Sequence, residues 1–119
     1  MFVASPKDVA DERAIAFQVL NKLAEDPLVE DRVALQVVAW DKRGVPMLAG
    51  VTPQEAIVQA LGRPSQCDIV IVILWSRIGT TLDPQSALGA EAPGESGTLW
   101  EYRDAVKASR ESGRPDVLV

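Results

Sequence analysis

The sequence predicts an α/β fold with a parallel sheet between two layers of helices, and two patterns carry that prediction. Short apolar segments alternate along the chain with segments of helical periodicity. One of these segments, Asp68–Trp75, is apolar at almost every position, which is typical of a central parallel strand with helices on both faces. Such an alternation is built from right-handed crossovers and gives a flavodoxin-like, three-layer architecture.

The expected strands are four: Met1–Ala4, Val33–Trp40, Asp68–Trp75 and Asp116–Val119. A sheet order of 2-1-3-4 puts the topological switch point between the first and third strands. A chain of 119 residues can bury one hydrophobic core, so we expect a single domain over residues 1–119. Because the last expected strand ends the sequence, we expect the fold to be truncated at its C-terminus, as a fragment of a longer multidomain protein.

Three helices are expected, at residues 6–24, 52–61 and 99–112. The first has Ser5 as its N-cap, Pro6 in the first turn and Asp8 in the place of a capping box. The second begins in the same way at Thr52, and the third begins with Thr98 followed three residues later by Glu101. The stretch Ser76–Gly97, rich in Gly, Pro, Ser and Ala, is expected to be a loop.

Composition excludes several classes of function. Histidine is absent and Cys67 is the only cysteine, so histidine-dependent catalysis, an intrachain disulfide and a cysteine-rich metal site are all ruled out, and we expect no metal and no cofactor. The net charge of −5 argues against nucleic-acid partners. The longest apolar run, Ile69–Trp75, is too short to span a bilayer, and the N-terminus does not resemble a signal peptide, so we expect no membrane contact and a cytoplasmic location.

Four segments are expected to meet beyond the carboxyl ends of the strands, where ligands bind in such sheets. The candidate binding residues in them are Ser5, Asp8, Trp40, Trp75, Arg77, Gly79, Thr80, Ser96 and Thr98. The tryptophans can stack a flat ring or simply cap the core, and Arg77 can bind a phosphate or an acid or lie in solvent. Asp8 and Arg13 are most simply explained as helix and surface charges. Glu101 is either one half of a capping box with Thr98 or a carboxylate that faces the crevice.

Several motifs together resemble the TIR-like domains that open many bacterial STAND ATPases. They are Phe2–Val9 with the following Glu12-Arg13, Cys67–Trp75 with Arg77-Ile-Gly-Thr80, and Ser96-Gly-Thr98 with Glu101-Tyr102 and Ala105. The family has Ser-Ser-Pro at its first motif, where this chain has Ala4 in place of the first serine. The matches occur in the family's order over nearly the whole chain, and the resemblance implies a TIR-like signalling or defence domain beside an ATPase or sensor domain.

The Gly-Thr-x-x-Glu segment is also similar to the helix start of nucleoside 2-deoxyribosyltransferases and of TIR domains that cleave NAD. That resemblance implies Glu101 as the catalytic residue of an NAD nucleosidase, with NAD as the substrate. Nicotinamide leaves NAD as a neutral molecule, so one carboxylate near the ribose suffices without a general acid. The alternative that the resemblance leaves open is a non-catalytic module that self-associates or recruits a protein partner.

Overall fold

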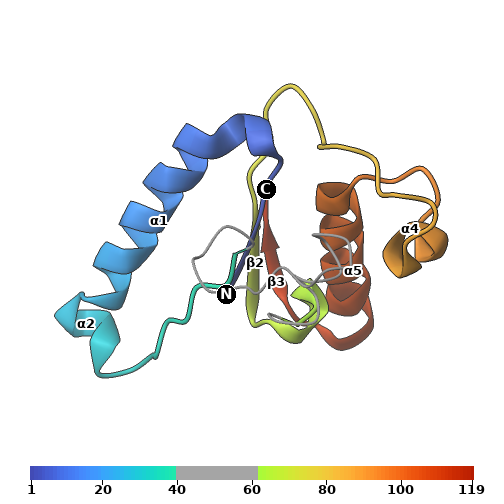
Figure 1. Ribbon diagram of the computed structural model, residues 1–119. Helices are drawn as coiled ribbons and strands as arrows, with labels where there is room; N and C mark the ends of the chain where they lie inside the picture. The colour runs from blue at the N-terminus through green and yellow to red at the C-terminus, as the bar shows by residue number, and fades with distance from the viewer. Residues whose placement is uncertain (40–61) are drawn as a thin grey trace.

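The computed structural model describes residues 1–39 and 62–119, and it has helices on both sides of a small parallel sheet (Figure 1). The sheet order is β1 (Phe2–Ala4), β2 (Ile69–Val72) and β3 (Asp116–Leu118), with both strand pairs parallel. Phe2 is in register with Val70, and Val70 with Val117. The predicted α/β class is confirmed. The four-stranded order 2-1-3-4 remains a prediction, because these three strands correspond only to the first, third and fourth of the expected strands.

The expected strand over residues 33–40 is wrong for the part that the structure describes. In residues 33–39 there is a single parallel bridge, between Val38 and Phe2. The backbone N–H of Val3 donates to the carbonyl of Val38 at 3.0 Å, and that of Val38 donates to the carbonyl of Met1 at 2.8 Å. A β1 of only three residues offers a short edge, so the pairing stops after these bonds. Trp40 and the expected helix 52–61 lie outside the described residues.

One long helix, α1 (Ala10–Ala24), covers one face of the sheet, and it follows a 3₁₀ turn, η1 (Lys7–Val9). Its expected N-cap is wrong, because Pro6 precedes the turn and no side chain caps it. The hydroxyl of Ser5 instead accepts a hydrogen bond from Nη1 of Arg13 at 2.9 Å. Arg13 also donates to the carbonyl of Pro6 at 3.3 Å and is only 6% exposed, so its prediction as a surface charge is wrong as well.

The opposite face is covered by α5 (Gly97–Ser112), and Figure 1 shows the sheet between α1 and α5. Ser96 is the N-cap of α5, since its Oγ accepts from the backbone N–H of Leu99 at 3.2 Å. The predicted capping box of Thr98 and Glu101 is therefore wrong, because both residues lie inside the helix. Gly113 ends α5 in the left-handed conformation, with φ of 78°, as its place after the helix predicts.

Three short helical segments complete the described chain: α2 (Pro27–Glu30), η2 (Pro64–Gln66) and α4 (Ala87–Glu91). The last lies in the stretch that the sequence predicted to be a loop, so that prediction is wrong in part. The hydroxyl of Ser86 caps α4 by accepting from the N–H of Gly89 at 2.9 Å. Leu88 packs in a small cluster with Leu82, Ala92 and Trp100, and this tertiary contact stabilises a helix too short to form alone.

Alternation along the strands divides the core into two clusters. Phe2 and Ala4 point toward α5 and pack with Val70, Val72 and Ala105. Val3 points the other way, toward α1, and packs with Leu20, Val37 and Ala39. Both faces of the sheet are therefore buried where the helices cover them.

Candidate functional site

The segment after β2 lies against the first turn of α5, and this junction brings two of the sequence motifs together. The hydroxyl of Ser96 donates to the carbonyl of Ile78 while it caps α5. Gly79 has φ of 105°, and a Cβ built on it would come within 3.2 Å of Oγ1 of Thr98 and 3.4 Å of Oγ of Ser96. A glycine is thus required here by its backbone conformation and by the close approach of the helix.

An ion pair joins the segments that follow β1 and β2. Nε of Arg77 lies 3.5 Å from Oδ2 of Asp8, and the arginine side chain is largely exposed. The structure thus brings together two candidate residues that are 69 positions apart by sequence number. Arg77 is thus paired with an acid and lies largely in solvent, and its binding of a phosphate stays a prediction.

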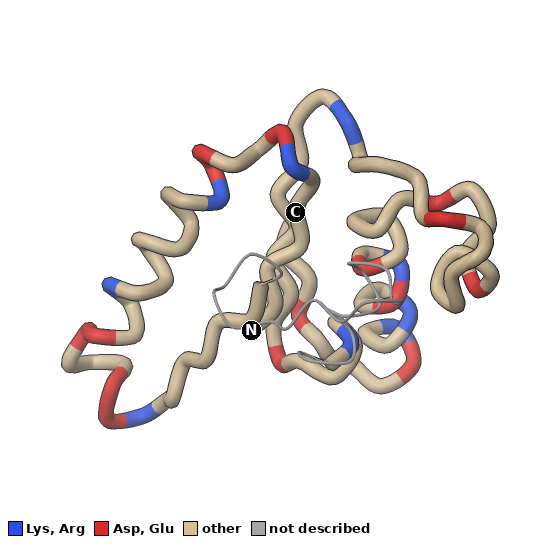
Figure 2. Tube along the Cα trace, in the orientation of Figure 1, with Lys and Arg blue, Asp and Glu red and all other residues tan. Residues whose placement is uncertain are grey.

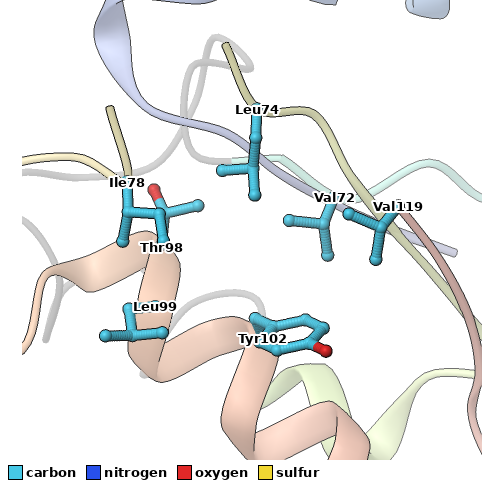
Figure 3. Close-up of a pocket in the computed structure, with 7 residues that line it drawn as sticks. All are labelled: Val72, Leu74, Ile78, Thr98, Leu99, Tyr102 and Val119. Carbon is cyan, nitrogen blue, oxygen red and sulfur yellow. The ribbon is translucent and has the colours of Figure 1, made fainter. Parts of the chain in front are cut away.

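A cavity of about 210 Å³ lies between the carboxyl ends of β2 and β3 and the first two turns of α5 (Figure 3). Its walls are almost entirely apolar, with the hydroxyls of Thr98 and Tyr102 as the polar groups among its side chains. The lining residues are Val72, Leu74, Ile78, Thr98, Leu99, Tyr102 and Val119. No charged side chain lines it, so this cavity fits an apolar group and not a phosphate or a ribose.

Glu101 is buried, with 3% of its surface exposed, but it does not line this cavity. Successive residues of a helix turn by about 100°, so Glu101 points roughly 105° away from the mean direction of Thr98, Leu99 and Tyr102. Glu101 precedes Ala105 by one turn, and Ala105 packs on the sheet against Phe2 and Val70. Glu101 therefore lies on the buried part of α5, one turn before Ala105, and outside the cavity on the β3 side.

The buried carboxylate is not an isolated charge in the protein. Among the described residues, no buried side-chain nitrogen or oxygen lacks a hydrogen-bond partner. Glu101 itself has at least one polar or electrostatic interaction. This pairing is what allows a carboxylate to remain in the interior, because an unpaired charge there costs several kcal/mol.

The remaining candidates do not converge on Glu101. Trp75 is 81% exposed beyond the end of β2, and Thr80 is also exposed, so neither side chain is enclosed by a binding site. Trp40 lies outside the described residues. Ser5 is buried, but its hydroxyl is engaged by Arg13. Five of the nine candidate binding residues thus form two structural junctions, Asp8 with Arg77 and Gly79 with Ser96 and Thr98.

Sequence reasoning missed one residue that organises this side of the molecule, Arg63. Its guanidinium donates to both carboxylate oxygens of Glu91, at 3.2 and 3.1 Å, and to Oδ1 of Asp104 at 3.5 Å. It also lies 5.3 Å from the centre of the Trp100 ring. These acidic partners raise the pKa of Arg63 further above its ordinary value, so the residue stays charged. In the sequence, Gly62-Arg63-Pro64 reads only as the end of a helix, and no local signal marks it.

Residues 1–39 and 62–119 contain no cluster of three or more acidic or cysteine side chains that could hold a metal ion. No helix in those ranges is long and apolar enough to cross a membrane. Comparison of the chain with protein-family models, with curated proteins and with solved structures found no match. The family therefore remains a prediction from the motifs.

Proposed function

We propose that the chain is a TIR-like signalling domain of a modular STAND-type protein and that it acts by association and not by catalysis. This proposal includes the flavodoxin-like order 2-1-3-4, a neighbouring ATPase or sensor domain in the same protein and a cytoplasmic location. One observation carries it: apolar side chains are exposed around the cavity at the carboxyl edge, whereas Glu101 is buried and turned away from that cavity.

The apolar surface at this edge is formed by side chains of the segment that follows β2, which are Leu74, Trp75 and Ile78. All three are exposed, and Leu74 and Ile78 also line the cavity (Figure 3). A cluster of exposed apolar groups with a tryptophan in it is typical of a protein-interaction surface. We call these three residues the edge surface.

A second candidate function is cleavage of the N-glycosidic bond of NAD, with Glu101 as the catalytic residue. It is favoured by the fact that Glu101 does not cap its helix and lies near the start of α5, the end of the helix that meets the segment after β2. In that reaction the bond between the ribose and nicotinamide breaks and nicotinamide leaves with the bonding electrons. The carboxylate stabilises the resulting oxocarbenium ion or attacks it, and water then supplies the hydroxyl of ADP-ribose. The burial of Glu101 argues against this function, because the ribose has to reach its carboxylate.

Two measurements on the full-length protein separate these candidates. In the first, the wild type and Glu101→Gln are incubated with NAD, and nicotinamide is quantified by chromatography. We expect equal background release from both proteins. Release by the wild type that the glutamine variant loses would overturn the association proposal in favour of catalysis.

The second measurement is sedimentation velocity over a concentration series for the wild type, Trp75→Ser and Leu28→Ser. Trp75 and Leu28 are each 81% exposed, so Leu28 is a matched control away from the edge surface. We expect Trp75→Ser to weaken association by at least about tenfold and Leu28→Ser to leave it unchanged, because a central tryptophan contributes most to such contacts. Equal behaviour of the two variants contradicts a role for the edge surface.

A further inference from the structure

The outer side of α1 carries an apolar stripe that no other described element covers. Ile15 is 60% exposed, Val19 57% and Leu23 41%, and the three residues are four positions apart. Side chains at this spacing lie one above another on a single helical face. The inner side of the same helix is occupied by Leu20 and Phe17, which pack against Val3. The helix is therefore apolar on two sides, although a helix covering a sheet needs only one apolar side.

Charge is distributed along this stripe in a way that selects its partner. Residues 14–21 carry no charge, and Glu12 lies before the apolar stretch while Lys22 lies within its last turn. Both charged residues are exposed. Figure 2 shows the uncharged middle of α1 with a basic position at each end; by sequence these are Arg13, which is buried, and Lys22, and Glu12 precedes Arg13. Glu12 and Lys22 are ten residues apart, which is about 15 Å along the helix axis.

We propose that the stripe binds a second copy of this chain, with the two α1 helices antiparallel about a two-fold axis. In this arrangement Glu12 of each copy lies opposite Lys22 of the other, so two ion pairs form. Ile15 of each copy then lies opposite Val19 of the other. This follows because the midpoint between Glu12 and Lys22 along the helix and the midpoint between Ile15 and Val19 are both at Phe17. The two most exposed residues of the stripe thereby form the middle of the contact, and Leu23 lies at its end.

The same charges disfavour a parallel pairing of these helices. It places Glu12 against Glu12 and Lys22 against Lys22, so each contact becomes repulsive. A partner that lacks an acid and a base at this separation cannot pair with Glu12 and Lys22 at the same time. The charges of α1 are thus complementary in the antiparallel direction only, and two antiparallel copies related by a two-fold axis form a closed dimer.

The contact is small, and its size fits its proposed role. A seam of three apolar residues on each helix buries less than the roughly 1,000 Å² that a stable interface needs, so the dimer is weak and reversible. Weak contacts become effective when the chains are brought together by neighbouring domains, which raise their effective concentration. This inference rests on the proposed association function and names one of its surfaces, while the edge surface remains a separate one.

The test uses the full-length protein carrying Trp75→Ser, so that contacts through the edge surface are removed. Dimerisation is measured by sedimentation equilibrium for Glu12→Lys, Lys22→Glu and the double exchange. We expect each single exchange to weaken dimerisation by about tenfold, because it replaces two weak attractions with two repulsions, and the double exchange to restore it. Glu30→Lys and Lys107→Glu make the same charge changes at exposed positions away from the stripe and serve as controls.

A further variant tests the apolar part of the contact. Val19→Gln keeps a helix-forming side chain at an exposed position, so circular dichroism is expected to be unchanged while dimerisation is lost. If the Trp75→Ser protein is monomeric at every concentration, this inference is overturned, and the stripe binds a partner other than a second copy. The proposed role of the edge surface is not affected by that result. Weakening by both single exchanges without recovery in the double exchange also overturns it. If dimerisation is weakened by the α1 exchanges but not by Trp75→Ser, the inference is supported and the proposed role of the edge surface is contradicted.

Discussion

The two faces of the sheet are covered by helices that are held in different ways. On one face, α5 packs through Ala105 onto Phe2 and Val70, and polar contacts attach it to η2 and α4 through Arg63 and Asp104. On the other face, α1 packs through Leu20 onto Val3, and its described polar ties lie near its N-terminal end, where Arg13 meets Ser5 and Pro6.

The α5 face is thus a rigid framework, whereas the outer side of α1 is an exposed surface. The start of α5 is fixed by Ser96 and Gly79, and the buried Glu101 lies in the second turn of this helix. A group that acts on a ligand needs such a rigid support. By contrast, α1 is fixed on its inner side only and presents Ile15 and Val19 to the outside. We therefore expect changes on the two faces to differ in kind and in size.

The largest expected effect is a fall in the free energy of unfolding when a side chain packed under α5 is removed. Phe2 is 1% exposed at the centre of its cluster, and Phe2→Ala is expected to lower the free energy of unfolding by ~3–5 kcal/mol. Leu20→Ala, on the α1 face, is expected to cost about 2 kcal/mol, near the low end for such substitutions, because one side of its helix is open to solvent. Urea denaturation of both variants measures the difference, with the exposed Val33→Ala as the control. An equal or larger cost for Leu20→Ala would show that the two faces are held alike.

A smaller effect is expected where polar contacts attach α5. Oδ2 of Asp104 accepts from the backbone N–H of Ser65 at 2.9 Å, and its side chain is mostly buried, so Asp104→Ala is expected to cost about 1–2 kcal/mol. Glu91 makes two bonds to Arg63, but both side chains are well exposed, so Glu91→Ala is expected to cost under about 1 kcal/mol.

Thermal denaturation of these two variants at low and high salt tests this ranking. The cost of Glu91→Ala is expected to shrink as salt rises, since exposed ion pairs are screened, whereas the Asp104 contact to the backbone is expected to persist. A larger cost for Glu91→Ala than for Asp104→Ala would mean that the ion pair, and not the bond to Ser65, attaches α5 to η2.

The framework was predictable because its signals are local. The apolar runs at Met1–Ala4, Asp68–Trp75 and Asp116–Val119 predicted the three strands, although each observed strand is shorter than its run, β2 most of all. Helical periodicity with a glycine behind it predicted α5 to its last residue. Each of these elements is specified by consecutive residues, so one sequence sufficed.

The errors lie where the outcome depends on residues far apart in the chain. Ser5 is a suitable N-cap by type, but its hydroxyl accepts from Arg13, eight residues later. Thr98 is suitable too, but the chain already enters α5 at Ser96, whose hydroxyl also reaches Ile78. The short α4 depends on Leu88 meeting Trp100, which no local pattern shows.

The candidate site was predictable in its place but not in its arrangement. The sequence predicted that Asp8, Arg77, Gly79 and Ser96 come to the carboxyl edge, and the structure brings them there as two pairs. The direction of Glu101 depends on which residue begins α5 and on how the helix is rotated over the sheet. That rotation is set by the packing of Ala105, so the sequence alone left capping and catalysis as alternatives.

The smallest expected effect is a pH dependence at the strand that both faces share. Cys67 precedes β2 and packs against the cluster under α5, and burial raises the pKa of its thiol, with the neighbouring charge of Asp68 adding to the effect and the N-terminal ammonium opposing it. The folded state thus favours the neutral thiol, and the unfolded chain loses this proton first. The stability that the thiol contributes is fully present below its ordinary pKa and is lost as the pH rises through the raised value.

Urea denaturation of the wild type and Cys67→Ala, carried out on both sides of the ordinary thiol pKa, measures this contribution. Other groups titrate in the same range, so the informative quantity is the difference between the two proteins and not either curve alone. We expect the wild type to lose more stability than Cys67→Ala as the pH rises, and Asp68→Asn to reduce that loss only in part, because burial is the larger cause. Parallel curves for the wild type and Cys67→Ala would mean that the thiol is as well solvated in the folded protein as in the unfolded chain, and that the α5 face is less closed at this end than its packing indicates.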